Sequence, residues 1–270
     1  MLKYFIQSNG LPQAKMSFSP PLVYLDTWAI NDFVDNPNLF LKFKNALQNS
    51  NGTLCISVMT IYEIVQRTDI KQIQNIGLML DQLNWGYIEF SPTKVCEQEN
   101  KLKYKSLDTC VDKETFKFHM TRKRDIHPFT TSEIITEVVG WKIQKNFFEE
   151  LNKSLSEFAS NPENKKMITQ WNSPLKKLIV PSTRDLWWKV RFYILSSGKK
   201  MTDTEWIDVF HLIVPCAYCD FVLLDKKWTE NFIKKIQNPQ NIEIAKVFWR
   251  NELELFIKSL NEFWSPKNTI

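Results

Sequence analysis

Short apolar segments alternate with helical stretches at both ends of the chain, and this alternation restricts the fold more than any other feature. The expected strands cover residues 22–25, 53–57, 87–90, 221–224 and 242–248. The expected helices cover about residues 38–48, 61–83, 204–218, 228–236 and 251–263. Strands that alternate with helices in this way predict βαβ units and an α/β fold with a parallel sheet.

The middle of the chain, about residues 91–200, shows mostly helical spacing instead. Ile134, Trp141 and Phe148 recur at helical intervals, and prolines interrupt the run. We therefore expect one domain over residues 1–270 with a mainly helical insertion at 91–200. Its core segments are expected at about residues 20–90 and 201–270.

The composition excludes several classes of protein. With 270 residues, of which 43% are hydrophobic and 24% charged, the chain can bury a full core. No apolar run approaches the roughly 18 residues that a membrane span needs. Five cysteines, an odd number, favour a reducing, cytoplasmic setting. Only six glycines are present and none forms a phosphate-binding loop, which argues against P-loop and dinucleotide-binding folds.

The positive charge of the chain is concentrated in the middle region. The whole chain carries +5, whereas residues 142–200 contain twelve Lys or Arg and five acids, a net +7. Trp171, Trp187, Trp188 and Tyr193 lie among these cations. Cations that meet phosphates and rings that stack on bases are typical of nucleic-acid surfaces. Solvated lysines on helices whose aromatic residues fill a core would give the same composition, and the sequence leaves both interpretations open.

Two acids follow directly on predicted strands. The segment "VYLDTW" places Asp26 at the end of the first strand, and "FVLLDKKW" places Asp225 at the end of the fourth. In an open parallel sheet, ligands gather beyond the carboxyl ends of the strands. Asp26 taken alone has a second interpretation as a helix cap.

Two acids on predicted helices are candidates for the same edge of the sheet. Glu63 lies in "TIYEIVQ", where Thr60-x-x-Glu63 also matches a capping box. Asp208 lies in "MTDTEWIDVFHLIVPCAYCD", one turn beyond a second capping box, Thr202-x-x-Glu205. An acid in so apolar a helix is costly if it is buried without a partner, and a bound cation would neutralise it.

The clustering of carboxylates predicts a metal site. Carboxylates that converge without matching arginines repel one another unless protons or cations lie between them. Hard cations such as Mg²⁺ and Mn²⁺ take oxygen ligands. Two such ions about 4 Å apart would activate a water molecule and stabilise the leaving oxygen in phosphodiester hydrolysis. The four acids therefore suggest metal-dependent phosphoryl chemistry.

The segments "VYLDTWAINDFV", "LCISVMTIYEIV" and "WIDVFHLIVPCAYCDFVLLDKKW" resemble, in this order, the motifs of the PIN-domain nuclease family. The resemblance covers roughly residues 22–90 and 202–248. It implies a three-layer PIN-like fold, with a central parallel sheet of about five strands flanked by helices. It also implies an acidic quartet that binds Mg²⁺ or Mn²⁺ and cuts RNA, made of Asp26, Glu63, Asp208 and Asp225.

The same resemblance implies a substrate and partners. Thr27, His211 and Lys226, each close to one of the acids in the sequence, are expected to contact the substrate. His211 has an alternative interpretation as a core or rim histidine. The expected partner is nucleic acid, RNA before DNA. An antitoxin or another regulatory protein, and a homo-oligomer, are compatible with the family. Trp28 departs from its pattern, because a small polar residue is usual there.

Three other interpretations stay open. A PIN-like module that binds nucleic acid or protein without catalysis would show salt-dependent nucleic-acid binding and no turnover. A phosphatase of the haloacid-dehalogenase type needs a second Asp two residues after the first, where this chain has Trp28. Cys216-x-x-Cys219 is either half of a zinc site or a pair of buried thiols.

Overall fold

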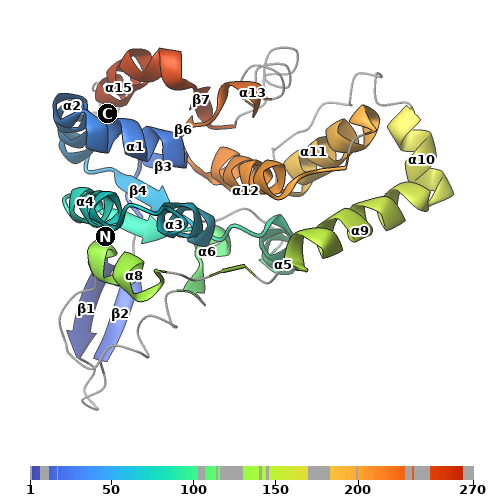
Figure 1. The fold of residues 1–270 in the computed structure, drawn as a ribbon, viewed down its shortest axis with the longest axis horizontal. Helices are drawn as coiled ribbons and strands as arrows, with labels where there is room; N and C mark the ends of the chain where they lie inside the picture. Colours follow the sequence, from blue (N-terminus) through green and yellow to red (C-terminus); the bar gives the residue numbers. More distant parts are fainter. Residues whose placement is uncertain are drawn as a thin grey trace.

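A five-stranded sheet lies at the centre of the computed structural model, and its strands come from both ends of the chain (Figure 1). In the spatial order β5-β4-β3-β6-β7, the strands are Trp85–Tyr87, Thr53–Ile56, Leu22–Leu25, Phe221–Leu223 and Lys246–Phe248. All four pairings between neighbours are parallel. The prediction of an α/β fold with a central parallel sheet of about five strands is confirmed.

The structure describes most of the chain. The residues outside the described part are 1, 7–11, 17, 103–106, 114, 116–129, 140–141, 144–145, 170–182, 199, 229–232, 234–243 and 264–270.

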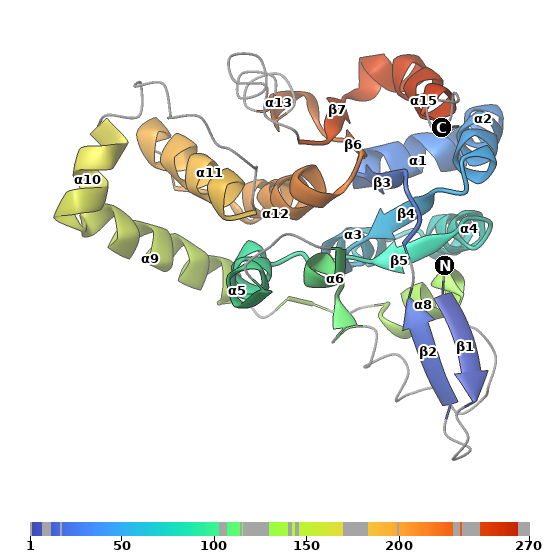
Figure 2. The same cartoon turned by 180° about the vertical axis from the view of Figure 1, so that it is seen from behind.

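Alternate residues of the central strands face two separate hydrophobic cores, so the fold has three layers (Figures 1 and 2). Val23 and Leu25 belong to one core, whereas Leu22 and Tyr24 belong to the other. The first core is covered mainly by α1 (Thr27–Asp35), α2 (Pro37–Asn49), α4 (Ile70–Leu80) and α15 (Leu253–Glu262). The second is covered mainly by α5 (Pro92–Leu102), α11 (Thr183–Ser197) and α12 (Asp203–Tyr218). Parallel strands buried on both faces need such a cover on each side.

Residues 61–83, predicted as one helix, form two helices, and that prediction was wrong. The first is α3 (Val58–Val65) and the second is α4. The Asp69 side chain accepts hydrogen bonds from the backbone N–H groups of Lys71 and Gln72, and this cap starts a new helix. The apolar spacing continues across the break, which is why periodicity alone did not reveal it.

Further differences concern the ends of elements. Helix α1 was not predicted, and neither was the antiparallel hairpin of β1 (Leu2–Ile6) and β2 (Pro12–Met16). Strand β5 begins two residues before the predicted 87–90, and Ile88 instead forms an isolated bridge with Val111. Strand β7 is shorter than the predicted 242–248, of which residues 242–243 lie outside the described part. A short 3-10 helix, η2 (Arg250–Glu252), precedes α15.

The described residues between 91 and 200 are mainly helical, as predicted. Besides α5 and α11 they form α6 (Leu107–Cys110), α8 (Thr131–Glu137), α9 (Phe147–Ser160) and α10 (Pro162–Thr169). Both ribbon views show α9, α10 and the outer end of α11 extending away from the sheet (Figures 1 and 2). The exact limits of the insertion stay a prediction. None of the helices in the described part has both the length and the apolar character that crossing a membrane requires.

Candidate metal centre

The strand-end acids lie at the carboxyl edge of the sheet. Asp26 follows β3 and precedes α1, and its backbone N–H donates a 3.0 Å hydrogen bond to the carbonyl of Leu223 in β6. Asp225 lies two residues after β6, and its Oδ1 accepts a 3.0 Å bond from the backbone N–H of Trp228. The direct bond between the two strand ends holds this edge together.

The two helix-borne acids have different local settings. Ser57, not Thr60, caps α3, so Glu63 lies in the body of that helix and the capping-box interpretation of Glu63 was wrong. The second capping box is confirmed, because Thr202 and Glu205 cap α12 with reciprocal hydrogen bonds. Asp208 lies three residues beyond Glu205 and takes no part in that cap. Both Glu63 and Asp208 are half-buried.

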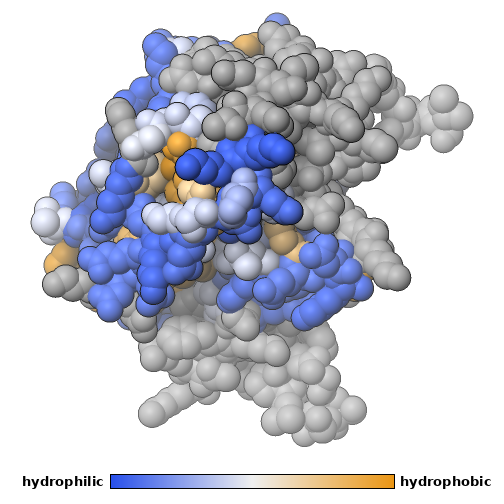
Figure 3. Space-filling view, turned by 90° about the vertical axis from the view of Figure 1, so that its right-hand side faces the viewer, coloured by the Kyte–Doolittle hydropathy of each residue, from blue (hydrophilic) through white to orange (hydrophobic). Residues whose placement is uncertain are grey.

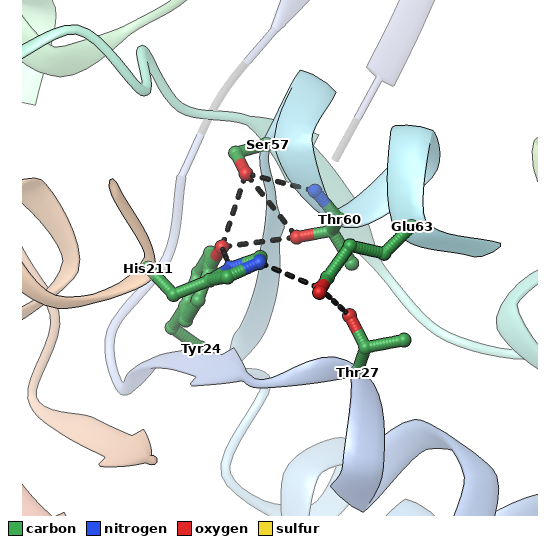
Figure 4. A network of polar contacts seen from close by, with 6 residues as sticks. All are labelled: Tyr24, Thr27, Ser57, Thr60, Glu63 and His211. Atoms are coloured by element: carbon green, nitrogen blue, oxygen red, sulfur yellow. Dashed lines mark hydrogen bonds and ion pairs between the residues drawn. The ribbon is translucent and has the colours of Figure 1, made fainter. Parts of the chain in front are cut away.

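A hydrogen-bond network connects β3, α3 and α12 and includes Glu63 (Figure 4). The Tyr24 hydroxyl lies 3.0 Å from both Ser57 Oγ and Thr60 Oγ1, and 2.5 Å from His211 Nδ1. The other ring nitrogen of His211, Nε2, lies 2.8 Å from Glu63 Oε2. His211 is only 1% exposed, so both ring nitrogens are committed within the protein. The network fixes the orientation of the imidazole ring, so that Nε2 is the nitrogen that contacts Glu63.

Three ligand atoms converge at one point of this edge. Asp26, Glu63 and His211 each offer one atom, and the three atoms lie within 4.8 Å of one another. Thr27, which is buried, donates a hydrogen bond to Glu63 Oε2 as well. Of the four predicted acids, the structure brings Asp26 and Glu63 into this group. We call Asp26, Glu63 and His211 the three-residue cluster.

Asp208 and Asp225 lie outside the three-residue cluster; Asp208 influences the charge of Asp26, and Asp225 influences that of Asp208. The negative charge of Asp208 raises the pKa of Asp26, and the charges of Asp225 and Glu63 raise the pKa of Asp208. The four predicted acids therefore form a connected series of like charges. That they all bind metal stays a prediction.

The pKa values of two acids reflect this crowding. Burial raises the pKa of Asp26 to about 7; His211 opposes the shift, and Glu63 and Asp208 add to it. Burial also raises the pKa of Asp208 to about 6, and the carboxylate of Asp225 contributes. Near neutral pH Asp26 in the metal-free site is therefore partly protonated, although an aspartate in water is fully ionised there. A cation would relieve the same repulsion.

Glu63 and His211 behave as an ion pair. Burial opposes the charge of Glu63, but the imidazole of His211 and the hydrogen bond from Thr27 hold the pKa of this carboxyl below its usual value. Burial likewise opposes a charged imidazole, yet Tyr24 and Glu63 raise the pKa of His211 well above its usual value. In the metal-free protein, both shifts therefore favour the charged form of each partner.

The donor set of the three-residue cluster fits a divalent cation. Carboxylate oxygens suit Mg²⁺ and Mn²⁺ alike, whereas an imidazole nitrogen is a ligand that transition metals accept more readily than Mg²⁺. A ligating histidine usually has its other ring nitrogen engaged by a hydrogen-bond partner, and Tyr24 is in that place. The residues therefore fit Mn²⁺ better than Mg²⁺.

The three residues expected to contact substrate have different positions. Lys226 is exposed, and its Nζ lies 4.9 Å from the centre of the Trp249 ring. Thr27 and His211 are buried and hydrogen-bonded to Glu63, so in this arrangement they position the acid. Tyr24, Ser57 and Thr60 were not predicted as site residues. No local signal distinguishes a tyrosine in a buried strand from an ordinary core residue.

Other sequence features belong to the core. Cys216 and Cys219 are buried, and burial raises the pKa of each thiol, which supports the interpretation as buried thiols. Trp187 is also buried and packs against Trp206, and Lys189 is only 3% exposed. The burial of Trp187 and Lys189 supports the interpretation that aromatic residues of segment 142–200 fill a core. Trp171 lies outside the described residues.

A hollow of about 620 Å³ lies away from the three-residue cluster, between α9 and α11. Its lining residues include Glu149, Asn152, Lys153, Ile194 and Lys200. The outer end of the molecule, where these helices extend, is largely hydrophilic where it is coloured, with only small hydrophobic areas (Figure 3). None of the predicted site residues lines this hollow, so the candidate centre is identified by its chemistry and not by concavity.

Comparisons with family models, with curated proteins and with solved structures give no significant match for this chain.

Proposed function

We propose that this protein is a PIN-like, divalent-metal-dependent nuclease that hydrolyses phosphodiester bonds in RNA. One observation carries the proposal: ligand atoms of Asp26, Glu63 and His211 lie within 4.8 Å of one another at the carboxyl edge of a parallel sheet. This edge is where ligands bind in open α/β sheets. The order of the acidic motifs along the chain, with Asp208 near Asp26 and Asp225 near Asp208, supports the same family.

Each residue has a role that follows from its position. Asp26 and Glu63 would hold the cation, with His211 as a third ligand whose ring Tyr24 keeps in place. A bound divalent cation would supply Lewis acidity at the phosphate and lower the pKa of water. Asp208 and Asp225, on the adjoining α12 and the end of β6, would extend the negative site. Thr27 holds Glu63 in position by its hydrogen bond.

Cleavage of labelled RNA with Mn²⁺ or Mg²⁺ tests the proposal. The wild type is compared with Asp26→Asn and Asp208→Asn, alone and together. Asp203→Asn is the matched control, because Asp203 is an exposed acid at the start of the same helix as Asp208. We expect at least a hundredfold loss of cleavage for each site variant and none for the control, with higher activity in Mn²⁺ than in Mg²⁺.

Two results would contradict the nuclease proposal. Cleavage that survives both substitutions, or that persists in EDTA, would show that these acids do not support it. Salt-dependent RNA binding with no metal-dependent turnover in the wild type would replace it with a non-catalytic binding module.

A further inference from the structure

Three strands end in register at the edge that carries the acids. Leu25 of β3 pairs with Leu223 of β6, and Leu223 pairs with Phe248 of β7. The backbone N–H groups of Asp26 and Leu224 continue this ladder by donating to the carbonyls of Leu223 and Phe248. The residues just after these strands therefore emerge side by side. They include Trp28, Lys226, Trp249 and Arg250.

These four residues form two cation–aromatic pairs. Lys226 Nζ lies 4.9 Å from the centre of the Trp249 ring, and the guanidinium carbon of Arg250 lies 5.1 Å from the centre of the Trp28 ring. Asp32, one turn after Trp28 on α1, holds Arg250 with contacts of 2.9 Å to Nε and 3.1 Å to Nη2. Arg250 is thus held over the Trp28 ring, and Asp32 neutralises its charge through the ion pair.

Lys226 differs from Arg250 because its charge is available. It is exposed, and it forms no ion pair with another residue in the described part of the chain. It also follows Asp225 directly in the sequence. Trp28 and Trp249 are both partly exposed, whereas Trp187 and Trp206 are buried. The edge with the acids therefore carries two partly exposed indole rings, of which Trp28 also packs against the first core, and one available cation.

We propose that Trp28, Trp249, Lys226 and Arg250 form a platform that binds unpaired nucleotides of an RNA strand beside the three-residue cluster. The proposal rests on the proposed function and adds to it a binding site for unpaired nucleotides, made by residues outside the acidic motifs. Indole rings stack on bases of any sequence, and a lysine beside them neutralises a phosphate. Bases in a duplex stay stacked on one another and cannot lie against a protein ring, so duplex RNA is a poor ligand for this platform.

Binding without cleavage separates the platform from the chemistry. The probe is a fluorescently labelled single-stranded RNA, titrated in EDTA so that no cleavage occurs, with anisotropy as the readout. Trp249→Ala is expected to raise Kd by about fivefold or more, because stacking on that ring is lost. Lys226→Ala is expected to reduce the slope of log Kd against log salt by about 0.7, the value for one phosphate contact in a single strand.

The chain offers a matched control on β7, the strand that Trp249 follows directly. Lys246 is also exposed and also lies near an aromatic ring, with Nζ 5.7 Å from the centre of Phe221, but it is at the amino end of β7. Lys246→Ala therefore removes the same charge away from the acids, and its Kd and salt slope should match the wild type. Trp249→Phe keeps a stacking ring and should recover most of the affinity.

The outcomes distinguish this inference from the nuclease proposal. Equal affinity for single-stranded and duplex RNA, or a Kd that Trp249→Ala and Lys226→Ala change no more than Lys246→Ala, would overturn the platform. A wild type that binds through these residues but does not cleave with Mn²⁺ would overturn only the nuclease function. Cleavage whose KM is unaffected by Trp249→Ala would overturn only the platform.

Discussion

The hydroxyl of Tyr24 lies 2.5 Å from Nδ1 of His211, although 187 positions separate the two residues in the sequence. Tyr24 belongs to β3 and His211 to α12, so the contact joins the central strand to the helix that covers it. Because Nδ1 is engaged, Nε2 is directed at Glu63. The same hydroxyl also contacts Ser57 and Thr60 at the start of α3. One buried group thus aligns the three elements that carry the site.

Tyr24→Phe tests this alignment. The substitution keeps the ring but leaves buried polar groups without their shared partner, so we expect the free energy of unfolding to fall by about 1–3 kcal/mol. If His211 is a ligand, Mn²⁺ affinity should also fall by about 10- to 100-fold, as when an outer hydrogen-bond partner of a ligand is lost. Denaturant unfolding in EDTA and a calorimetric Mn²⁺ titration measure the two effects. Tyr193→Phe, a half-buried tyrosine outside the network, is the control.

The stability of the metal-free protein should decrease as the pH rises from about 5 to 8. The pKa of Asp26 is raised to about 7, so the folded state holds a proton that the unfolded chain has lost above about pH 4. The contribution of this bound proton to the free energy of unfolding is lost as the pH rises toward 7. The raised pKa of His211 acts in the same direction above about pH 6.5, whereas the lowered pKa of Glu63 has its effect below pH 5. Thermal unfolding in EDTA across this range checks the sign, and a rise in stability would contradict it.

Asp26→Asn should stabilise the metal-free protein at pH 8 while weakening its response to metal. The variant removes a half-buried negative charge that other acids repel. We expect a gain of about 1–2 kcal/mol, which is less than the full pKa shift would give because solvent screens a half-buried group. Saturating Mn²⁺ should raise the Tm of the wild type by several degrees through its preference for the folded state. The same addition of Mn²⁺ should raise the Tm of Asp26→Asn much less. Equal metal-induced shifts would exclude Asp26 as a ligand.

Glu99 should determine how firmly α11 is attached to the rest of the protein. This buried carboxylate on α5 accepts hydrogen bonds from Tyr218 Oη at 2.7 Å and Thr183 Oγ1 at 2.8 Å, on α12 and α11 respectively. Glu99→Ala leaves both hydroxyls without this acceptor, and we expect a loss of about 2 kcal/mol or more. Hydrogen exchange should rise over residues 183–197. Glu97→Ala, an exposed acid on the same helix, should change neither quantity.

Local patterns in the sequence were sufficient for much of the fold and for the placing of the acids. The alternation of strands and helices predicted the parallel sheet, because fully buried strands and amphipathic helices leave different periodicities. The positions of Asp26 and Asp225 after strands also followed from the sequence, since parallel strands present their carboxyl ends at one edge. The break before α4 was missed because a single side chain, Asp69, decides it against a continuous apolar pattern.

Only the tertiary structure decided what surrounds those acids. Tyr24 looks like a core residue in the sequence, and its role comes from contacts with groups 33, 36 and 187 positions away. His211 was predicted to contact substrate, which stays a prediction; packing buries it and brings its two ring nitrogens to Tyr24 and Glu63. The pairing of Lys226 with Trp249 depends on β6 and β7 ending in register. Such pairings depend on distance in space, which periodicity along the chain does not encode.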